Sequence, residues 1–193
     1  MTVEHHPLQP FLPSNAQLLM LGSFPPSKKR WCMDFFYPNF SNDMWRIFGI
    51  VFFDDKNHFV DLEHKCFRKD DIMDFLTQHG IALYDTATAV VRTKNTASDK
   101  DLEVVEPTDV DALLSCLPQC KAIATTGQKA TDVLCAHFGL AQQPPVGGFV
   151  EFQHGNQSMR LYRMPSSSRA YPLGIQQKAQ AYKQMLFHSL QLL

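Results

Sequence analysis

Several features that mark whole classes of protein are missing from this chain. Its 193 residues carry a net charge of −1, whereas proteins that coat nucleic acid without sequence preference are usually basic. Any contact with nucleic acid must therefore be confined to a few phosphates and one pocket. No apolar run approaches the ~18 residues of a membrane span, so we expect no membrane contact. Residues 1–13 have neither a basic start nor an apolar stretch of signal length, which favours a cytoplasmic protein.

The cysteines, histidines and glycines also exclude common kinds of site. The five cysteines are odd in number and include no CxxC pair, and the eight histidines show no metal-ligating spacing. This pattern indicates free thiols in a reducing compartment, with no zinc site or iron–sulfur cluster. The chain also lacks a G-x-S-x-G nucleophile elbow and a glycine-rich phosphate loop, which weakens the alternative of an unrelated small-molecule α/β hydrolase. We expect no metal and no cofactor.

What the chain does have is apolar residues in plenty. They make up 45% of the sequence and include 15 phenylalanines, some of which are candidates for stacking on flat ligands while most fill the core. The length favours a single domain over residues 1–193, and we expect a monomer. Residues 1–15 contain three prolines and predict an extended arm.

Apolar runs and helical spacing alternate along the chain. Short apolar runs predict strands at residues 17–22, 81–91 and 121–127, with a strand pair at 149–153 and 159–164. Apolar residues at helical spacing predict helices that begin after Ser41 or Asn42 and after Thr108, and that cover 68–80, 128–139 and 175–190. The polar stretch 92–107 predicts a loop. This alternation predicts a three-layer α/β/α fold around a mainly parallel sheet.

Three polar loops follow predicted strands, at residues 23–42, 92–101 and 165–172. Ligands of parallel sheets bind in loops beyond the carboxyl ends of the strands. We therefore expect the functional site where these three loops meet.

The motifs in and beside these loops, taken in order, resemble those of the uracil-DNA glycosylase superfamily. They comprise Gly22-Ser23-Phe24-Pro25, Phe35-Phe36-Tyr37-Pro38 with Asn42-Asp43-Met44-Trp45-Arg46, Ala82-Leu83-Tyr84-Asp85-Thr86 and Met164-Pro165-Ser166-Ser167-Ser168. The resemblance spans residues 17–190 and is closest to the hypoxanthine-DNA glycosylase and mismatch-specific branches.

This resemblance implies a monofunctional DNA glycosylase of base-excision repair, whose partner is DNA that contains a damaged or mismatched base. Such an enzyme flips the target nucleotide into a pocket and hydrolyses the bond between base and sugar. The implied substrate is a deaminated base, either uracil or hypoxanthine. Gly22, Ser23, Phe24 and Pro25 correspond to the turn on the substrate side of the pocket.

Two residues are candidates for catalysis. Asn42 can donate and accept hydrogen bonds at once, which suits contact with the base or a water, although it can equally be a plain helix cap. Asp85 stands at the base-reading position and can accept the N–H of uracil or hypoxanthine, or it can cap a turn. Phe36 is the candidate for stacking on the base, with Phe35 as the alternative, and both can instead belong to the core. Asn39 is a second amide candidate.

Contacts with the DNA backbone are expected from hydroxyl, backbone N–H and basic groups in two of the loops. The candidates are Ser98, Lys100, Pro165, Ser166, Ser167, Ser168 and Arg169. Serine runs are also common in ordinary surface loops, so each of these residues has a purely structural alternative.

Two positions depart from the family pattern. Many members carry Asp, Asn or Glu before the proline of the first motif, where this chain has Phe24, and many begin the last motif with His, where it has Met164. These departures favour an alternative in which the protein binds DNA or a nucleobase without catalysis, whereas Asn42 and Asp85 favour the enzyme.

Overall fold

A five-stranded sheet forms the centre of the computed structural model, which describes residues 2–94, 96 and 98–192. In spatial order its strands are β5 (Ile81–Asp85), β2 (Leu18–Gly22), β8 (Ala122–Thr126), β10 (Gln157–Met164) and β9 (Phe149–His154). The first four pair in parallel and β9 pairs antiparallel at the edge. The predicted mainly parallel sheet is confirmed.

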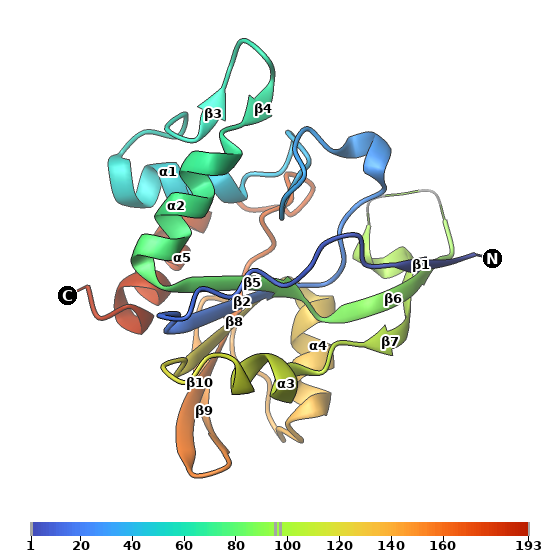
Figure 1. Ribbon diagram of the computed structural model, residues 1–193, viewed down its shortest axis with the longest axis vertical. Coiled ribbons are helices and arrows are strands. Elements are labelled where there is room, and N and C mark those ends of the chain that lie inside the picture. Colours follow the sequence, from blue (N-terminus) through green and yellow to red (C-terminus); the bar gives the residue numbers. More distant parts are fainter. Residues whose placement is uncertain (1, 95, 97, 193) are drawn as a thin grey trace.

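Helices cover both faces of this sheet (Figure 1). On one face lie α1 (Met44–Phe53), α2 (Lys69–His79) and α5 (Ile175–Ser189), and on the other lie α3 (Val110–Ser115) and α4 (Gln128–His137). Every residue of β2, β5 and β8 is buried, which explains why these strands are apolar runs and do not alternate with polar residues. The three-layer α/β/α prediction is confirmed.

A second, smaller sheet corrects two of the predictions. It consists of β1 (Val3–His5), β6 (Ala87–Arg92) and β7 (Leu102–Pro107), all antiparallel in the order β1-β6-β7. The run 81–91 begins as a strand, as predicted, but its extent as one strand is wrong, because the chain leaves the central sheet after β5 and enters the small sheet as β6. The loop predicted at 92–107 is also wrong: it contains the 3₁₀ turn η2 (Asp99–Asp101) and β7, whose largely exposed positions carry the polar residues.

The arm predicted at residues 1–15 is extended, but it is bound to the rest of the molecule. β1 pairs with β6, and further along Phe11 exchanges two backbone hydrogen bonds of 2.9 Å with Leu83 of β5. We call residues 2–8 the strap. They include β1, an edge strand of the small sheet, and His6, which contacts Asp85 at the end of β5.

Two helix starts differ in detail from the sequence prediction. Asp109, not Thr108, caps α3 by accepting the Ala112 N–H at 2.9 Å. The Thr108 hydroxyl instead donates to the backbone oxygen of Asp85 at 2.7 Å. At α1 the N-cap residue is Asp43, not Ser41 or Asn42 as predicted; the Asn42 side chain, one residue earlier, accepts the Met44 N–H at 2.9 Å.

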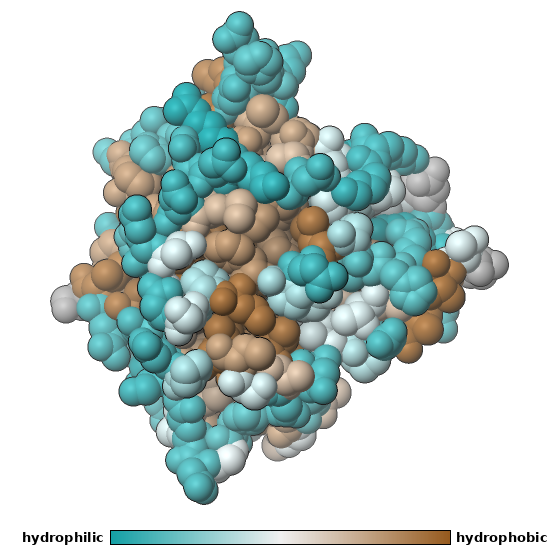
Figure 2. Space-filling view, viewed as in Figure 1, coloured by the Kyte–Doolittle hydropathy of each residue, from teal (hydrophilic) through white to brown (hydrophobic). Residues whose placement is uncertain are grey.

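The remaining elements are the 3₁₀ turn η1 (Lys28–Arg30) and a hairpin of β3 (Val60–Asp61) and β4 (Cys66–Phe67), which projects at the top of Figure 1. None of the helices in the described ranges is long and apolar enough to cross a membrane. Hydrophilic residues cover much of the face shown in Figure 2, with apolar residues gathered toward its middle.

Candidate active site

A cavity of about 290 Å³ opens at the carboxyl ends of β2, β5 and β8, where Gly22, Asp85 and Thr126 line it. Most of the predicted site residues meet there. They are Gly22, Ser23, Phe24, Pro25, Phe36, Asn39, Asn42, Asp85, Ser166, Ser167, Ser168 and Arg169. The expectation that the loops after parallel strands share one site therefore agrees with the geometry.

Three predicted site residues lie outside the lining of this cavity. Pro165 lies behind the serine loop, where its backbone oxygen accepts the buried Tyr182 hydroxyl at 2.8 Å. Ser98 and Lys100 are exposed in the turn before β7, and the Ser98 hydroxyl accepts the Lys100 backbone N–H at 3.4 Å. The role in DNA binding predicted for these three residues stays a prediction.

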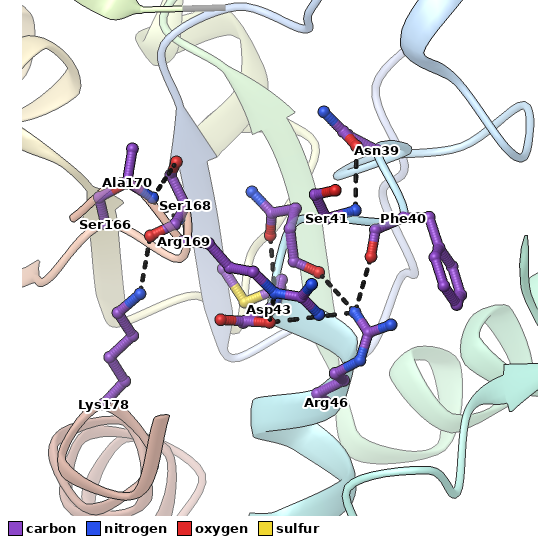
Figure 3. Close-up of polar contacts among 12 residues, drawn as sticks. Asn39, Phe40, Ser41, Asp43, Arg46, Ser166, Ser168, Arg169, Ala170 and Lys178 are labelled. Atoms are coloured by element: carbon purple, nitrogen blue, oxygen red, sulfur yellow. Dashed lines mark hydrogen bonds and ion pairs between the residues drawn. The ribbon is translucent and has the colours of Figure 1, made fainter. Parts of the chain in front are cut away.

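One side of the cavity, which we call the helix-side wall, takes its lining residues from the two segments 36–43 and 165–170. Its two segments are joined by a backbone bridge between Asn42 and Ser168 and by the Asp43 N–H, which donates to Ser167 at 2.9 Å. The Arg169 guanidinium also donates to Asp43 at 2.9 Å (Figure 3). The wall is therefore held by backbone pairing and by an ion pair with a buried carboxylate.

Two cations support the helix-side wall from behind. Lys178 of α5 is 1% exposed and donates to the Ser168 backbone oxygen at 2.7 Å, and burial lowers the pKa of its ammonium group. Arg46 of α1 donates to the backbone oxygens of Phe40 and Asn42 at 2.8 and 3.1 Å. Figure 3 shows both side chains reaching from their helices to the loops. Buried donors of this kind leave the loop little freedom to move.

The Asn42 side chain combines a structural contact with a free donor. Its amide oxygen is committed to the Met44 N–H. Its amide nitrogen has no hydrogen-bond partner among the residues that the structure describes, and Asn42 lines the cavity. At this position Asn42 can offer a hydrogen bond to a ligand, while its acceptor is used by the helix.

The structure distinguishes between the two phenylalanines proposed for stacking. Phe36 lines the cavity and packs edge-on against Tyr84, with ring centroids 6.2 Å apart. Phe35 stacks on Trp45 in the core, at 6.2 Å, and is not part of the cavity lining. Phe36 is therefore the one placed to contact a flat ligand.

Asp85 lies at the end of β5, 6% exposed. One carboxylate oxygen, Oδ2, accepts a hydrogen bond from His6 Nε2 at 2.8 Å. The other, Oδ1, packs against Gly22, where an added Cβ would lie only 2.5 Å from it. Glycine at position 22 thus leaves room for the carboxylate at the floor of the cavity.

Among the residues that were missed from the sequence, Asp99 and Tyr37 line the cavity and His6 lies directly behind its lining. Asp99 lines the cavity from η2 and is hydrogen-bonded to the Ser23 side chain. Burial, and then the nearby charge of Asp85, raise the pKa of the Asp99 carboxyl. Nothing in the polar stretch around Asp99 distinguishes it from its neighbours, because its place depends on the fold of the small sheet.

Tyr37 stands inside a motif that the sequence had singled out, yet its own role was not predicted. Its backbone has a φ of 51°, a left-handed conformation that is uncommon for a bulky residue. The hydroxyl lies 3.0 Å from Thr126 Oγ1 at the end of β8, and burial raises its pKa. Tyr37 thereby ties the helix-side wall to the central sheet.

No group of three or more His, Cys, Asp or Glu side chains in the described part of the chain is arranged to hold a metal ion. The polar groups available for chemistry at the cavity are therefore amides, hydroxyls, carboxylates and one guanidinium.

Comparison with known proteins adds a likeness in fold. No family model matches the sequence, and no curated protein matches it. Among solved structures, the chain is similar to the solution NMR structure of a "putative Uracil DNA glycosylase" from Methanosarcina acetivorans, with a TM-score of 0.63 and 20% sequence identity. The match covers 97% of this chain and 99% of that one. The chain therefore has an α/β fold of the uracil-DNA glycosylase type.

Proposed function

We propose that the protein is a DNA glycosylase that takes a deaminated base into the cavity and hydrolyses its bond to the sugar. The observation that carries this proposal is that one cavity gathers Phe36 and Asn42 from the segment before α1 and Asp85 from the end of β5. The likeness in fold to a protein described in those terms supports it. DNA with a damaged base is accordingly the proposed partner.

The bases that the cavity could recognise follow from the hydrogen-bonding atoms of Asp85 and Asn42 that remain free for a ligand. Asp85 offers an acceptor and Asn42 offers a donor. Uracil and hypoxanthine both present an N–H beside a carbonyl oxygen, which is the complementary pair. Adenine and cytosine present an unprotonated ring nitrogen at that edge, which would face the Asp85 carboxylate as a second acceptor. Phe36 supplies a ring on which the base can stack, a contact that contributes about 1–3 kcal/mol per base.

Departure of the base needs stabilisation of negative charge and a positioned water. The Asn42 N–H can donate to the carbonyl oxygen on which that charge develops. Asp99 is our candidate for orienting the water, because its carboxyl faces the cavity and burial raises its pKa toward the range useful for a base. It would supply a polar group that Phe24 lacks in the first motif.

The serine loop is proposed to contact the DNA strand beside the flipped nucleotide. Ser166, Ser167, Ser168 and Arg169 line the cavity mouth, and Arg169 has a side chain 53% exposed despite its contact with Asp43. Hydroxyl, backbone N–H and guanidinium groups are the usual donors to phosphate oxygens.

A second candidate function is binding of a nucleobase or DNA without catalysis. Two observations favour it: Phe24 places an apolar ring in the cavity lining, and Met164, where many relatives in the resembled superfamily carry His, is 1% exposed and contributes nothing to the lining.

Base release from labelled DNA distinguishes the two candidates. Single- and double-stranded substrates would carry uracil, hypoxanthine, xanthine or a thymine mismatch, and undamaged DNA would be the control. We expect release of uracil or hypoxanthine, and a strong loss of release in an Asn42→Ala, Asp99→Asn double variant. Tight binding of a damaged strand with no release from any substrate would instead establish the second candidate.

A further inference from the structure

The strap brings a buried imidazole to the edge of the cavity. β1 pairs with β6, and directly after it the His6 backbone N–H donates to Thr88 at 2.8 Å. This pairing directs the His6 side chain inward, where only 2% of it is exposed. The neighbouring His5 is exposed on the same strap, so the two adjacent histidines have opposite environments.

His6 packs among aromatic rings that separate it from the cavity. Its ring lies 4.6 Å from that of Tyr84, 5.2 Å from Phe24 and 6.2 Å from Phe36. Phe24 and Phe36 line the cavity, whereas His6 does not. His6 can therefore affect a bound ligand only through the residues that it touches.

The hydrogen bonds of His6 fix which of its nitrogens carries a proton. Nε2 lies 2.8 Å from Asp85 Oδ2, and Nδ1 lies 3.1 Å from the Leu8 N–H and 3.0 Å from the Leu8 oxygen. A neutral ring with its proton on Nε2 donates to Asp85 and accepts from Leu8. A protonated ring donates to Asp85 and to the Leu8 oxygen. In both forms Nε2–H donates to the carboxylate.

We propose that His6 is a positioning residue that holds Asp85 for reading the base, which makes the strap part of the binding site. This inference rests on the proposed function. The His6 bond occupies Oδ2 and fixes the orientation of the carboxylate, so that Oδ1, above Gly22, remains to accept the N–H of the base. A carboxylate free to rotate would present this acceptor in the wrong place for part of the time.

The strap is tied to the cavity at a second point. Arg92 donates to Glu4 of the strap at 3.0 Å and to the backbone oxygen of Pro25 in the first motif. The strap is therefore connected to Asp85 through His6 and to the first motif through Arg92, and both side chains lie beside the Phe24 ring. This arrangement makes the position of the strap and the shape of the base site depend on each other.

The test compares His6→Ala, His6→Gln and the exposed control His5→Ala in single-turnover release of the base that the wild type removes. We expect His6→Ala to slow release by about 10–100-fold, the usual cost of losing a partner that orients a reacting group. His6→Gln should recover most of the rate, because its amide nitrogen can donate to Asp85 from nearly the same place. His5→Ala should match the wild type, and melting temperatures would be recorded for all three variants.

A second measurement detects the proton of the His6–Asp85 hydrogen bond directly. Nitrogen-15 NMR of the unmodified protein should find the His6 proton on Nε2, and a proton on Nδ1 alone would overturn the inference. Unimpaired release by His6→Ala in an active protein would overturn it while leaving the proposed function intact. A wild type that releases no base from any substrate would overturn the proposed function itself and the base-reading role with it.

Discussion

The two sides of the cavity are held in place by different kinds of contact. The helix-side wall is joined by backbone hydrogen bonds and supported by Lys178, which is 1% exposed. The opposite side, which we call the small-sheet wall, consists of residues 22–26 and Asp99. Apart from Gly22, whose backbone oxygen accepts the Thr86 N–H at 2.8 Å, its supports are side chains: Arg92 on Pro25, the Trp31 indole N–H on Pro26 at 2.7 Å, and Ser23 on Asp99.

This difference matches the chemistry proposed for each side. A donor that must meet a developing charge works best when its position is fixed in advance, and Asn42 stands on the firmly held wall. The small-sheet wall carries Asp99, whose carboxylate is costly to bury. One wall of the cavity is thus firmly held, and the other carries a carboxylate whose burial lowers the stability of the fold. Residues that lower stability are common at functional sites.

The largest expected effect is the loss of the free donor on the helix-side wall. Asn42→Ala should slow base release by about 10²–10⁴-fold, the range for one positioned polar catalyst. It should also lower the stability by about 0.5–2 kcal/mol, because the Met44 N–H in the first turn of α1 loses its side-chain acceptor. Single-turnover release and thermal melting measure the two effects.

Asn42→Asp is the matched control, because aspartate keeps the side-chain oxygen that accepts the Met44 N–H and lacks the N–H donor. We expect a stability close to that of the wild type together with slow base release. If the aspartate variant released the base at the wild-type rate, Asn42 would be only a helix cap.

Substituting a tryptophan beside each wall compares how much packing stabilises the two walls. Trp45 is 1% exposed and donates to the Phe36 backbone oxygen at 3.1 Å, so Trp45→Ala should lower the free energy of unfolding by about 3–5 kcal/mol. Trp31 is only partly buried, and Trp31→Ala should cost about 1–2 kcal/mol. Urea unfolding of both variants checks this order, and equal losses would contradict the contrast between the walls.

The same contrast explains how far the sequence could predict the site. The helix-side wall and the central sheet follow from local signals: apolar runs at β2 and β8, an asparagine at a helix start, and a proline–serine loop before α5. The small sheet could not be separated from the central one, because the apolar residues of β6 continue the run of β5, and β7 is mostly exposed with a sequence typical of a polar loop. His6 and Asp99 reach the site only through pairing between β1, β6 and β7, which no short window of sequence encodes.

Replacing the half-buried Asp99 carboxyl on the small-sheet wall should lower the rate of base release without lowering the stability of the fold. A carboxyl whose pKa is raised on folding favours the folded state below its ordinary pKa, and this contribution is lost as the pH rises through the raised value. Asp99→Asn should therefore be at least as stable as the wild type at neutral pH. Its base release should fall by about 10²-fold if Asp99 orients the water.

The pH dependence of base release tests whether the ionised Asp99 carboxylate is the active form. Wild-type release should decline as the pH falls through the raised pKa of Asp99, and the variant should lack that decline. Glu103→Gln, an exposed change on β7, serves as the control and should leave both properties unchanged. A destabilised but fully active Asp99→Asn variant would assign Asp99 to structure alone.

The smallest expected effect concerns the salt dependence of DNA binding. With about three to five phosphate contacts, log K should fall with log salt at about −0.9 per contact, and a slope steeper than about −7 would mean a much larger interface. Arg169 is half exposed at the cavity mouth and already paired with Asp43. Arg169→Ala should therefore weaken binding modestly and make the slope shallower by about one. Lys121 is exposed directly before β8, at the edge of the sheet opposite the cavity, so Lys121→Ala should leave the slope unchanged. If both variants changed the slope equally, the DNA would not be bound at the serine loop, and the contact proposed between that loop and the strand beside the flipped nucleotide would be wrong.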